Sequence, residues 1–152
     1  MKTNFAKIVE MPSTWWKQTG EEIASFIYEN VTVKGLDYKD RPFKALDPRY
    51  ATRKASGKIR RSHASAKANL FLTGDMMGNL KYIRHDKQSV TIGWSAGESE
   101  KLVGNANMGR IVTTQSTAIS PKTQRRLDRF IYQQTEKNIK KNDTRNIIKL
   151  GR

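Results

Sequence analysis

The sequence predicts an α+β fold in which a small antiparallel sheet is packed by an N-terminal and a C-terminal helix, with long extended loops. Helical periodicity near both ends of the chain predicts the two helices, and alternation of apolar and polar residues in the middle predicts the sheet. A turn-rich stretch between them predicts the loops. A length of 152 residues fits a single domain over residues 1–152.

The first helix is expected over residues 13–30. Ser13 or Thr14 can cap it, and Gly20 weakens it slightly. Its apolar residues recur at the three- and four-residue spacing of one buried stripe: Trp16, Thr19, Ile23, Phe26 and Ile27. We therefore expect a single buried face.

A basic loop follows at about residues 31–67, too long and too rich in turn formers for an ordinary connection within a compact domain. Within it, Asp47 is a good N-cap and Pro48 suits the first position of a short helix through Lys54. The part from Arg49 to Lys67 has seven basic residues and no acidic one. Loops of this kind are functional or disordered.

A short buried strand is expected over residues 69–72, leading into a turn formed by Thr73, Gly74, Asp75 and Met76. A threonine cap, a glycine and a carboxylate in the first helical turn explain this motif without any chemistry. Residues 81–84 and 89–94 then predict a hairpin.

The remaining third of the chain is less regular. Residues 95–110 are rich in Gly and Asn and predict a loop with one helical turn, and residues 110–119 predict another strand. Ser120 and Pro121 are typical of a helix start. The apolar side of that last helix comprises Leu127, Phe130, Ile131 and Gln134, and a basic tail follows at about residues 140–152.

The charge is the strongest compositional signal. The chain has 29 Lys and Arg against 14 Asp and Glu, a net charge of +15, which favours a polyanion or an acidic protein surface as partner. It has no cysteine, which excludes disulfides and thiolate chemistry. Neither a signal peptide nor a membrane span is predicted. We expect assembly in a cytoplasm.

Catalysis is not predicted. The two histidines, His63 and His85, show no arrangement with a serine and a carboxylate. His85 with Asp86 is better explained as a polar turn than as a metal site. Asp37 and Asp40 could pair as a general acid and base, but the loop that carries them is expected to be solvent-exposed and flexible. The sequence therefore predicts no enzyme and no cofactor or metal.

The basic loop has two interpretations. Lys and Arg interleaved with small residues and with Tyr50 suit phosphate contacts with an occasional stacking ring. The same loop also suits a solvated segment or an arm that docks on an acidic neighbour. The candidate contacts to DNA or to an acidic partner are Lys58, Arg60, Arg61 and Lys67.

The order of these motifs resembles the tail-completion and virion-morphogenesis proteins of tailed phages. That family has a segment of the form G-x-D-x-x-G-x-x-F-x-x-L-x-x-x-Y-A-x-x-K, followed by an L-F-L-T-G-x-M-like element and two strands. The matching residues are Gly35, Asp37, Phe43, Leu46, Tyr50, Ala51, Lys54, Leu70, Leu72, Thr73, Gly74, Asp75, Met76 and Leu80.

Two departures from the family pattern stand out. Asp40 occupies the position of the second glycine of the first motif. The segment "GRIVTTQSTAISPKTQ" replaces an Arg-Pro-Phe-Leu-like element before the last helix. Because of these departures, the resemblance specifies neither how the C-terminal strand and the last helix pack nor which ring the protein would join.

The resemblance implies a structural virion protein, a ring-forming neck subunit of the tail-completion or tail-terminator kind. Its partners would be its own copies, commonly six, the head-side connector or portal adaptor, the tail tube protein, and genomic DNA passing through the channel. The subunit or partner contacts predicted from the arm are Arg41, Phe43, Tyr50, Arg53 and Lys54. The alternative is a small basic nucleic-acid-binding protein.

Overall fold

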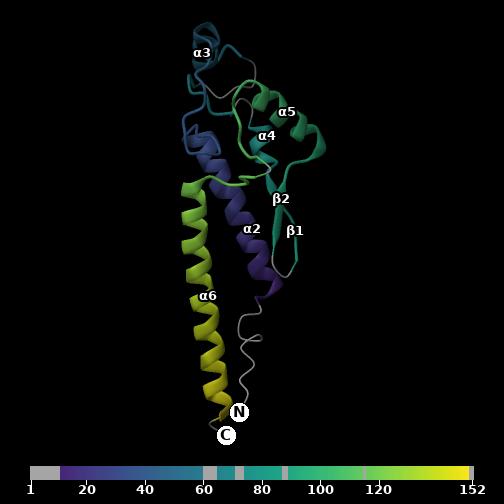
Figure 1. The fold of residues 1–152 in the computed structure, drawn as a ribbon, viewed down its shortest axis with the longest axis vertical. Coiled ribbons are helices and arrows are strands. Elements are labelled where there is room, and N and C mark those ends of the chain that lie inside the picture. Colours follow the sequence, from purple (N-terminus) through teal and green to yellow (C-terminus); the bar gives the residue numbers. More distant parts are fainter. Residues whose placement is uncertain (1–10, 60–64, 71–73, 87–88, 115, 151–152) are drawn as a thin grey trace.

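A computed structural model describes residues 11–59, 65–70, 74–86, 89–114 and 116–150 (Figure 1). Its elements confirm the predicted α+β class, with a sheet of two antiparallel strands. In chain order they are α2 (Ser13–Tyr28), the π-helical turn η1 (Glu29–Val33), α3 (Pro48–Ala55), α4 (Asp75–Gly78), β1 (Lys81–His85), β2 (Val90–Gly93), α5 (Ala96–Asn107) and α6 (Pro121–Leu150).

Helix α2 lies between the hairpin and α6 (Figure 1), so it is α2 that covers the strands while α6 packs against α2. The helix begins at Ser13 without a side-chain cap. The carbonyl of Pro12 instead accepts hydrogen bonds from the backbone amides of Trp15 and Trp16. The predicted cap at Ser13 or Thr14 is therefore wrong, because both residues already lie inside the helix.

The sequence predicts one buried face for α2, but the helix has two. One faces the hairpin and the core through Gly20, Ala24 and Ile27. The other faces α6, where the guanidinium of Arg126 lies 4.1 Å from the centre of the Phe26 ring. A helix with partners on two sides buries more of its surface than one amphipathic stripe, so the one-face pattern is a poor guide here.

Strands β1 and β2 form the predicted hairpin, with Tyr82 opposite Ile92 and His85 opposite Val90 and an irregularity between Tyr82 and Arg84. The hairpin approaches α2 closely at Gly20. A Cβ atom placed there would lie 2.6 Å from Cδ2 of Tyr82 and 2.8 Å from Cγ1 of Val90. Gly20 is thus required by packing, although it lowers helix propensity.

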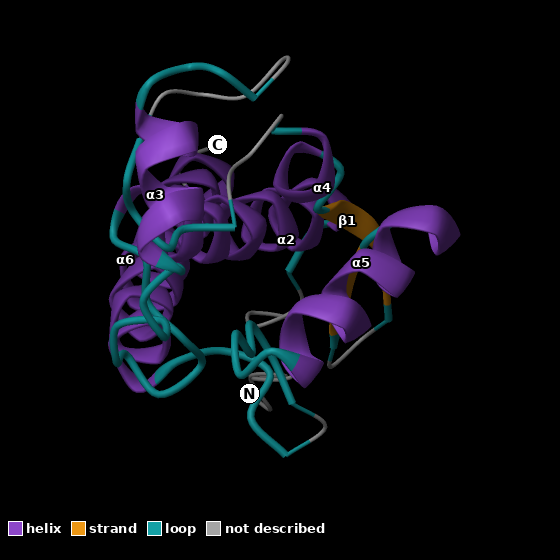
Figure 2. Ribbon diagram, turned by 90° about the horizontal axis from the view of Figure 1, so that it is seen from above, coloured by secondary structure: helices purple, strands orange, loops and turns teal. Residues whose placement is uncertain are grey.

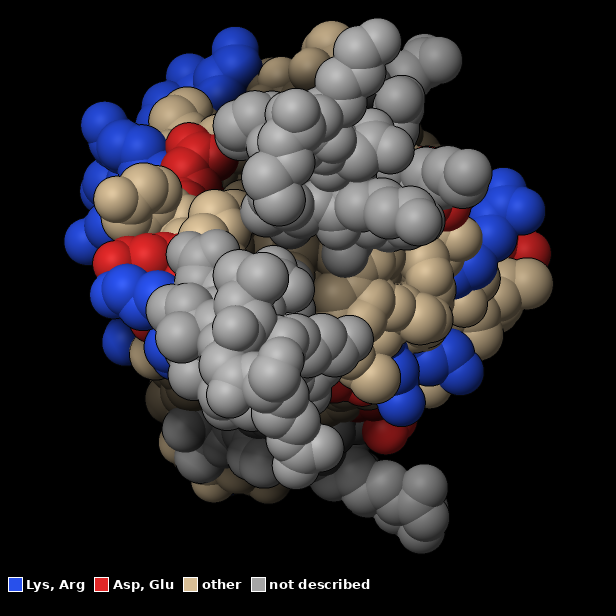
Figure 3. All heavy atoms as spheres, turned by 90° about the horizontal axis from the view of Figure 1, so that it is seen from below, with Lys and Arg blue, Asp and Glu red and all other residues tan. Residues whose placement is uncertain are grey.

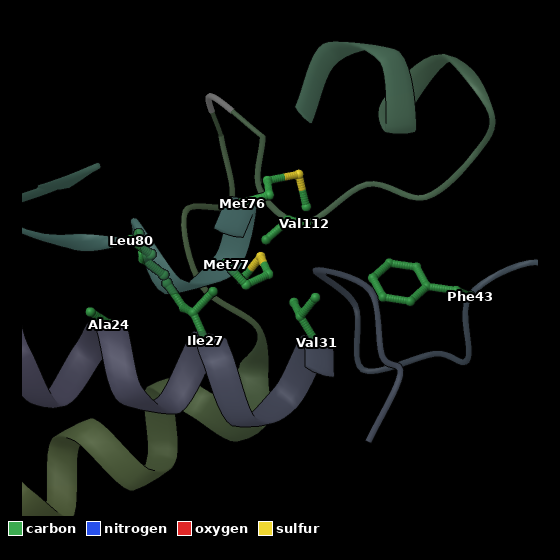
Figure 4. Packing of buried hydrophobic residues seen from close by; sticks show 8 residues of the cluster. All are labelled: Ala24, Ile27, Val31, Phe43, Met76, Met77, Leu80 and Val112. Carbon is green, nitrogen blue, oxygen red and sulfur yellow. The ribbon is translucent and has the colours of Figure 1, made fainter. Parts of the chain in front are cut away.

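The core lies between α2, η1 and α4 (Figure 4). Met77 is its deepest side chain at 1% exposure, and Figure 4 shows it directed toward Ile27 and Val31. The buried cluster is Ala24, Ile27, Val31, Phe43, Met76, Met77, Leu80 and Val112. It draws on segments far apart in the sequence, so the loop around Phe43 and the segment around Val112 are both held by this one core.

Within residues 95–110, for which the sequence predicts a loop with one helical turn, Ala96–Asn107 form a helix of 12 residues, α5. Gly97 and Gly104 obscure the helical period because each lowers helix propensity by about 1 kcal/mol. Leu102 packs against the core and supplies the tertiary contact that offsets this cost.

Two predicted strands are absent from the described residues. Leu70 has a φ of 36°, a left-handed conformation that a strand does not contain. In the segment 110–119, the carbonyl of Ile111 accepts a hydrogen bond from the amide of Tyr38, so its backbone pairs with a loop. The remainder of the first predicted strand, at 71–72, lies outside the described residues.

The first part of the predicted basic arm folds back on its own chain. Leu36 and Pro42 form an isolated antiparallel bridge, and the Asp37 carboxylate accepts hydrogen bonds from the amides of Lys39 and Arg41. Asp40 adopts a φ of 61°, in the left-handed region. The segment is therefore a compact loop rather than an extended arm.

Asp40 joins this loop to the start of α6. Its Oδ2 accepts a 2.8 Å hydrogen bond from the amide of Lys122. Burial raises the pKa of Asp40, but hydrogen bonds from Ser120, the Lys122 amide and Asn30 outweigh it, and the net pKa lies below its usual value. Asp37 and Asp40 thus serve structural roles.

The last helix begins at Pro121 as predicted, with Thr123 donating its amide hydrogen to Oγ of Ser120. It has 30 residues and is therefore about 45 Å long. Most of the predicted basic tail, through Leu150, is a continuation of this helix.

We predict that Gly20→Ala lowers the free energy of unfolding by about 1–3 kcal/mol, since the added methyl group would overlap Tyr82 and Val90. Gly104→Ala in α5 is the matched control, because nothing lies within 4 Å of its Cβ position. That change should raise stability by about 0.5–1 kcal/mol. Urea unfolding of both variants measures this, and equal effects would contradict the close approach.

We predict that Asp40→Asn lowers stability at pH 7 by about 0.3–1 kcal/mol, because it removes a negative charge at the N-terminus of α6. The folded state lowers the pKa of Asp40, so its contribution is complete above the unfolded value of about 3.9 and is lost as the pH falls through the folded pKa. The difference between variant and wild type should therefore shrink in acid. Urea unfolding between pH 7 and pH 3 measures it, and a constant difference would rule out this role.

Candidate docking groove

A groove of about 810 Å³ lies at the end of the molecule where α3 and α5 are found. Figure 2, seen from above, shows these two helices on opposite sides of that end, with α4 beside them. The groove is lined by residues of α3, the segment 68–70, α4 and α5, and by Arg110. It is larger than a second hollow, of about 500 Å³, between α2 and β1.

Lys54 holds α3 in place beside the groove. Its side chain is 3% exposed, and Nζ donates hydrogen bonds to the Lys67 carbonyl at 2.9 Å and to Oδ1 of Asn69 at 2.7 Å. The Nδ2 of Asn69 in turn donates to the carbonyl of Thr32 at 2.8 Å. This chain of hydrogen bonds ties α3 to the end of η1.

Burial lowers the pKa of Lys54, and the positive charge of Arg110 lowers it further. The ammonium is solvated by neutral oxygens, and among the described residues it forms no ion pair with a carboxylate. The charged group of Lys54 is thus bound within its own subunit, and the role of Lys54 as an interface contact stays a prediction.

Arg110 is a second cation at the groove. Its Nε is buried and has no hydrogen-bond acceptor in the described part of the chain, while Nη1 lies 3.7 Å from the sulfur of Met108. A buried guanidinium N–H without an acceptor costs free energy. A carboxylate brought by a partner would satisfy this donor, since carboxylates are the best acceptors for guanidinium groups.

The walls of the groove are little buried by their own chain. Helix α5 has no buried residue, and α3 buries only Lys54. Among the residues that line it, Met108 is 53% exposed and Tyr50 38%. Exposed aromatic and methionine side chains beside an arginine are typical of the composition of protein interfaces.

The structure brings together several residues that the sequence singled out. Tyr50, Lys54, Gly74, Asp75 and Met76 all line the groove. Gly74 has a φ of 89° and precedes α4, and Asp75 lies in the first turn, as predicted. Thr73 lies outside the described residues.

The other predicted contacts are dispersed. Arg41 and Arg53 are exposed but do not line the groove, and Lys58 and Lys67 are also exposed. Phe43 is a core residue of its own chain, so its predicted role as an anchor for a neighbour is wrong. Arg60 and Arg61 lie outside the described residues.

Met108 and Arg110 were not predicted as site residues, because the Gly and Asn content of their segment predicts a loop. Helical spacing was the signal that could have found them. Leu102, which packs on the core, and the exposed Val103 define the inner and outer faces of α5.

His85 forms a second polar cluster, at the start of α2. Its Nε2 lies 3.3 Å from Oγ of Ser13, its Nδ1 lies 2.6 Å from the Tyr82 hydroxyl, and its ring is stacked at 6.2 Å on Trp16. A serine and a histidine therefore do meet. Neither lines any of the hollows found in the described residues, and we interpret the cluster as a clamp between hairpin and helix.

Comparisons with protein-family models, with curated proteins and with solved structures find no match for this chain. Among the described residues, no group of three or more acidic, histidine or cysteine side chains is arranged to hold a metal ion. No described helix combines the length and apolar character needed to cross a membrane.

We predict that Lys54→Met lowers the free energy of unfolding by about 1–3 kcal/mol, because it leaves Oδ1 of Asn69 and the Lys67 carbonyl without their donor. The neighbouring Arg53→Met is the matched control. Arg53 is exposed, so its loss should change stability by less than about 0.5 kcal/mol. Urea unfolding measures the stability of both variants. Equal losses of stability would contradict a structural role for Lys54.

Proposed function

We propose that this chain is a structural virion protein of a tailed bacteriophage, a ring-forming neck subunit of the tail-completion or tail-terminator kind. It would join the tail tube to the head-side connector or portal adaptor and leave a channel for genomic DNA. The observation that carries the proposal is the open groove between α3 and α5, in which the side chains of Tyr50 and Met108 are left exposed.

The backbone of the first motif supports the resemblance. Gly35 has a φ of 70°, and Asp40, which replaces the second glycine of the family motif, has a φ of 61°. Aspartate tolerates the left-handed region better than most residues. The departure at Asp40 therefore keeps a conformation that glycine adopts readily, and Phe43 after it reaches the core.

A ring requires two different surfaces on each subunit, so that one copy's groove receives another part of the next copy. The groove suits a segment that brings apolar side chains to Tyr50 and Met108 and a carboxylate to Arg110. Joining of this kind is a binding role, with no chemical step and no cofactor. The site of action would be the head–tail junction of the virion, after assembly in the host cytoplasm.

A second function, that of a small basic nucleic-acid-binding protein, is favoured by the net charge of +15. It does not account for the groove, since a partner held by charge alone needs no apolar hollow. The neck subunit is therefore the stronger proposal.

We predict that the double variant Tyr50→Ala, Met108→Ser abolishes ring assembly while leaving the monomer folded, because both side chains line the groove and are exposed in the isolated chain. Loss of two interface anchors worth about 2 kcal/mol each weakens a contact by a factor on the order of 10³. Light scattering after size exclusion, with negative-stain microscopy, measures the assembly.

Ile83→Thr is the control, since Ile83 is equally exposed on the hairpin and does not line the groove. It should assemble as the wild type does. Electron microscopy of lysates from a virus lacking this gene tests the role itself. Filled heads with separate tails are expected, and normally joined particles would sink the proposal.

A further inference from the structure

Helix α6 has an outward face with a regular series of charges. Spacings of three or four residues place its members on one side of the helix. The opposite side turns inward, with Thr123 and Leu127 buried. We define the outward face as Lys122, Arg125, Arg129, Tyr132, Glu136 and Lys140, all of which are exposed.

The inward cation of α6 is already used within the fold. Arg126 pairs with Glu29 at 2.7 Å and covers the Phe26 ring. On the outward face, Lys140 pairs with Glu136 at 2.7 Å. Lys122, Arg125 and Arg129 form no ion pair within the described part of the chain. Arg125 and Arg129 therefore keep a positive charge that the described residues leave unpaired, whereas the charge of Lys122 lies near the Asp40 carboxylate and helps to lower its pKa.

These three cations span about 10 Å along a helix with a rise of 1.5 Å per residue. Tyr132 follows one turn later and is 71% exposed, the most exposed large hydrophobic side chain in the described residues. Figure 3 looks along the molecule from the end where the termini lie. It shows Lys and Arg at the left edge, the side on which α6 lies in Figure 1, with Asp and Glu among them and further Lys and Arg at the right.

We propose that the outward face of α6 binds the phosphate backbone of duplex DNA. A stiff helix with cations at regular intervals matches a polymer whose charges are regularly spaced and dense. Arginine binds phosphate oxygens with two parallel hydrogen bonds, and the Tyr132 hydroxyl adds a further donor. This surface is separate from the groove, so the inference does not depend on ring assembly.

Fluorescence anisotropy of a labelled 20-base-pair duplex with the full chain, between 50 and 200 mM NaCl, tests the proposal. We expect the triple variant Lys122→Gln, Arg125→Gln, Arg129→Gln to weaken binding at least tenfold. The slope of log affinity against log salt should fall in magnitude by about 2 to 3, since each phosphate contact contributes about 0.9. Circular dichroism checks that α6 remains helical.

The matched control is Lys39→Gln, Lys44→Gln, Lys81→Gln, which removes the same charge from exposed positions outside α6. It should change the slope by less than 1. If the two triple variants lost the same amount of DNA affinity, the loss would reflect net charge alone, and the proposal would be overturned. A second result would also overturn it. If the α6 variant bound DNA as tightly as the wild type while Lys58→Gln with Lys67→Gln weakened binding, the contact would belong to the basic loop instead.

Discussion

The close packing of the hairpin against α2 is the constraint on which the rest of the structure depends. It is possible because Gly20 leaves room for the Tyr82 ring and Val90, and because Ala24 is small. With the hairpin seated there, α4 is placed beside Ile27, and Met77 becomes the deepest side chain of the core. The other face of α2 is then free to receive α6.

The two ends of the molecule are stabilised in different ways. Around α2, apolar side chains from distant segments are buried together. Around the groove, α3 is held by the hydrogen bonds of one buried ammonium, and α5 has no buried residue. Elements with so few buried apolar contacts have little local stability of their own. An interface with another chain would supply the missing burial, which is why we place the function at this end.

The basic residues of the chain fall into two groups with different surroundings. Arg126 and Lys54 are used inside the fold, where each is bound by oxygens and orders a neighbouring element. Lys122, Arg125 and Arg129 repeat along one side of a helix and form no ion pair with the described residues. Such a repulsive arrangement costs stability at low salt and favours an anionic partner. Composition alone does not separate these two groups.

Local chemistry determined much of this fold from the sequence alone. The hairpin, the cap formed by Asp47 with Pro48, the turn at Gly74 and the start of α6 at Pro121 all depend on residues close together in the chain. Only the tertiary structure decided the two buried faces of α2, the helical state of residues 96–107 and the burial of Phe43 and Lys54. The groove belongs to this second group. Its walls come from segments far apart in sequence, and burial depends on which of these segments meet in space rather than on the pattern of any one of them.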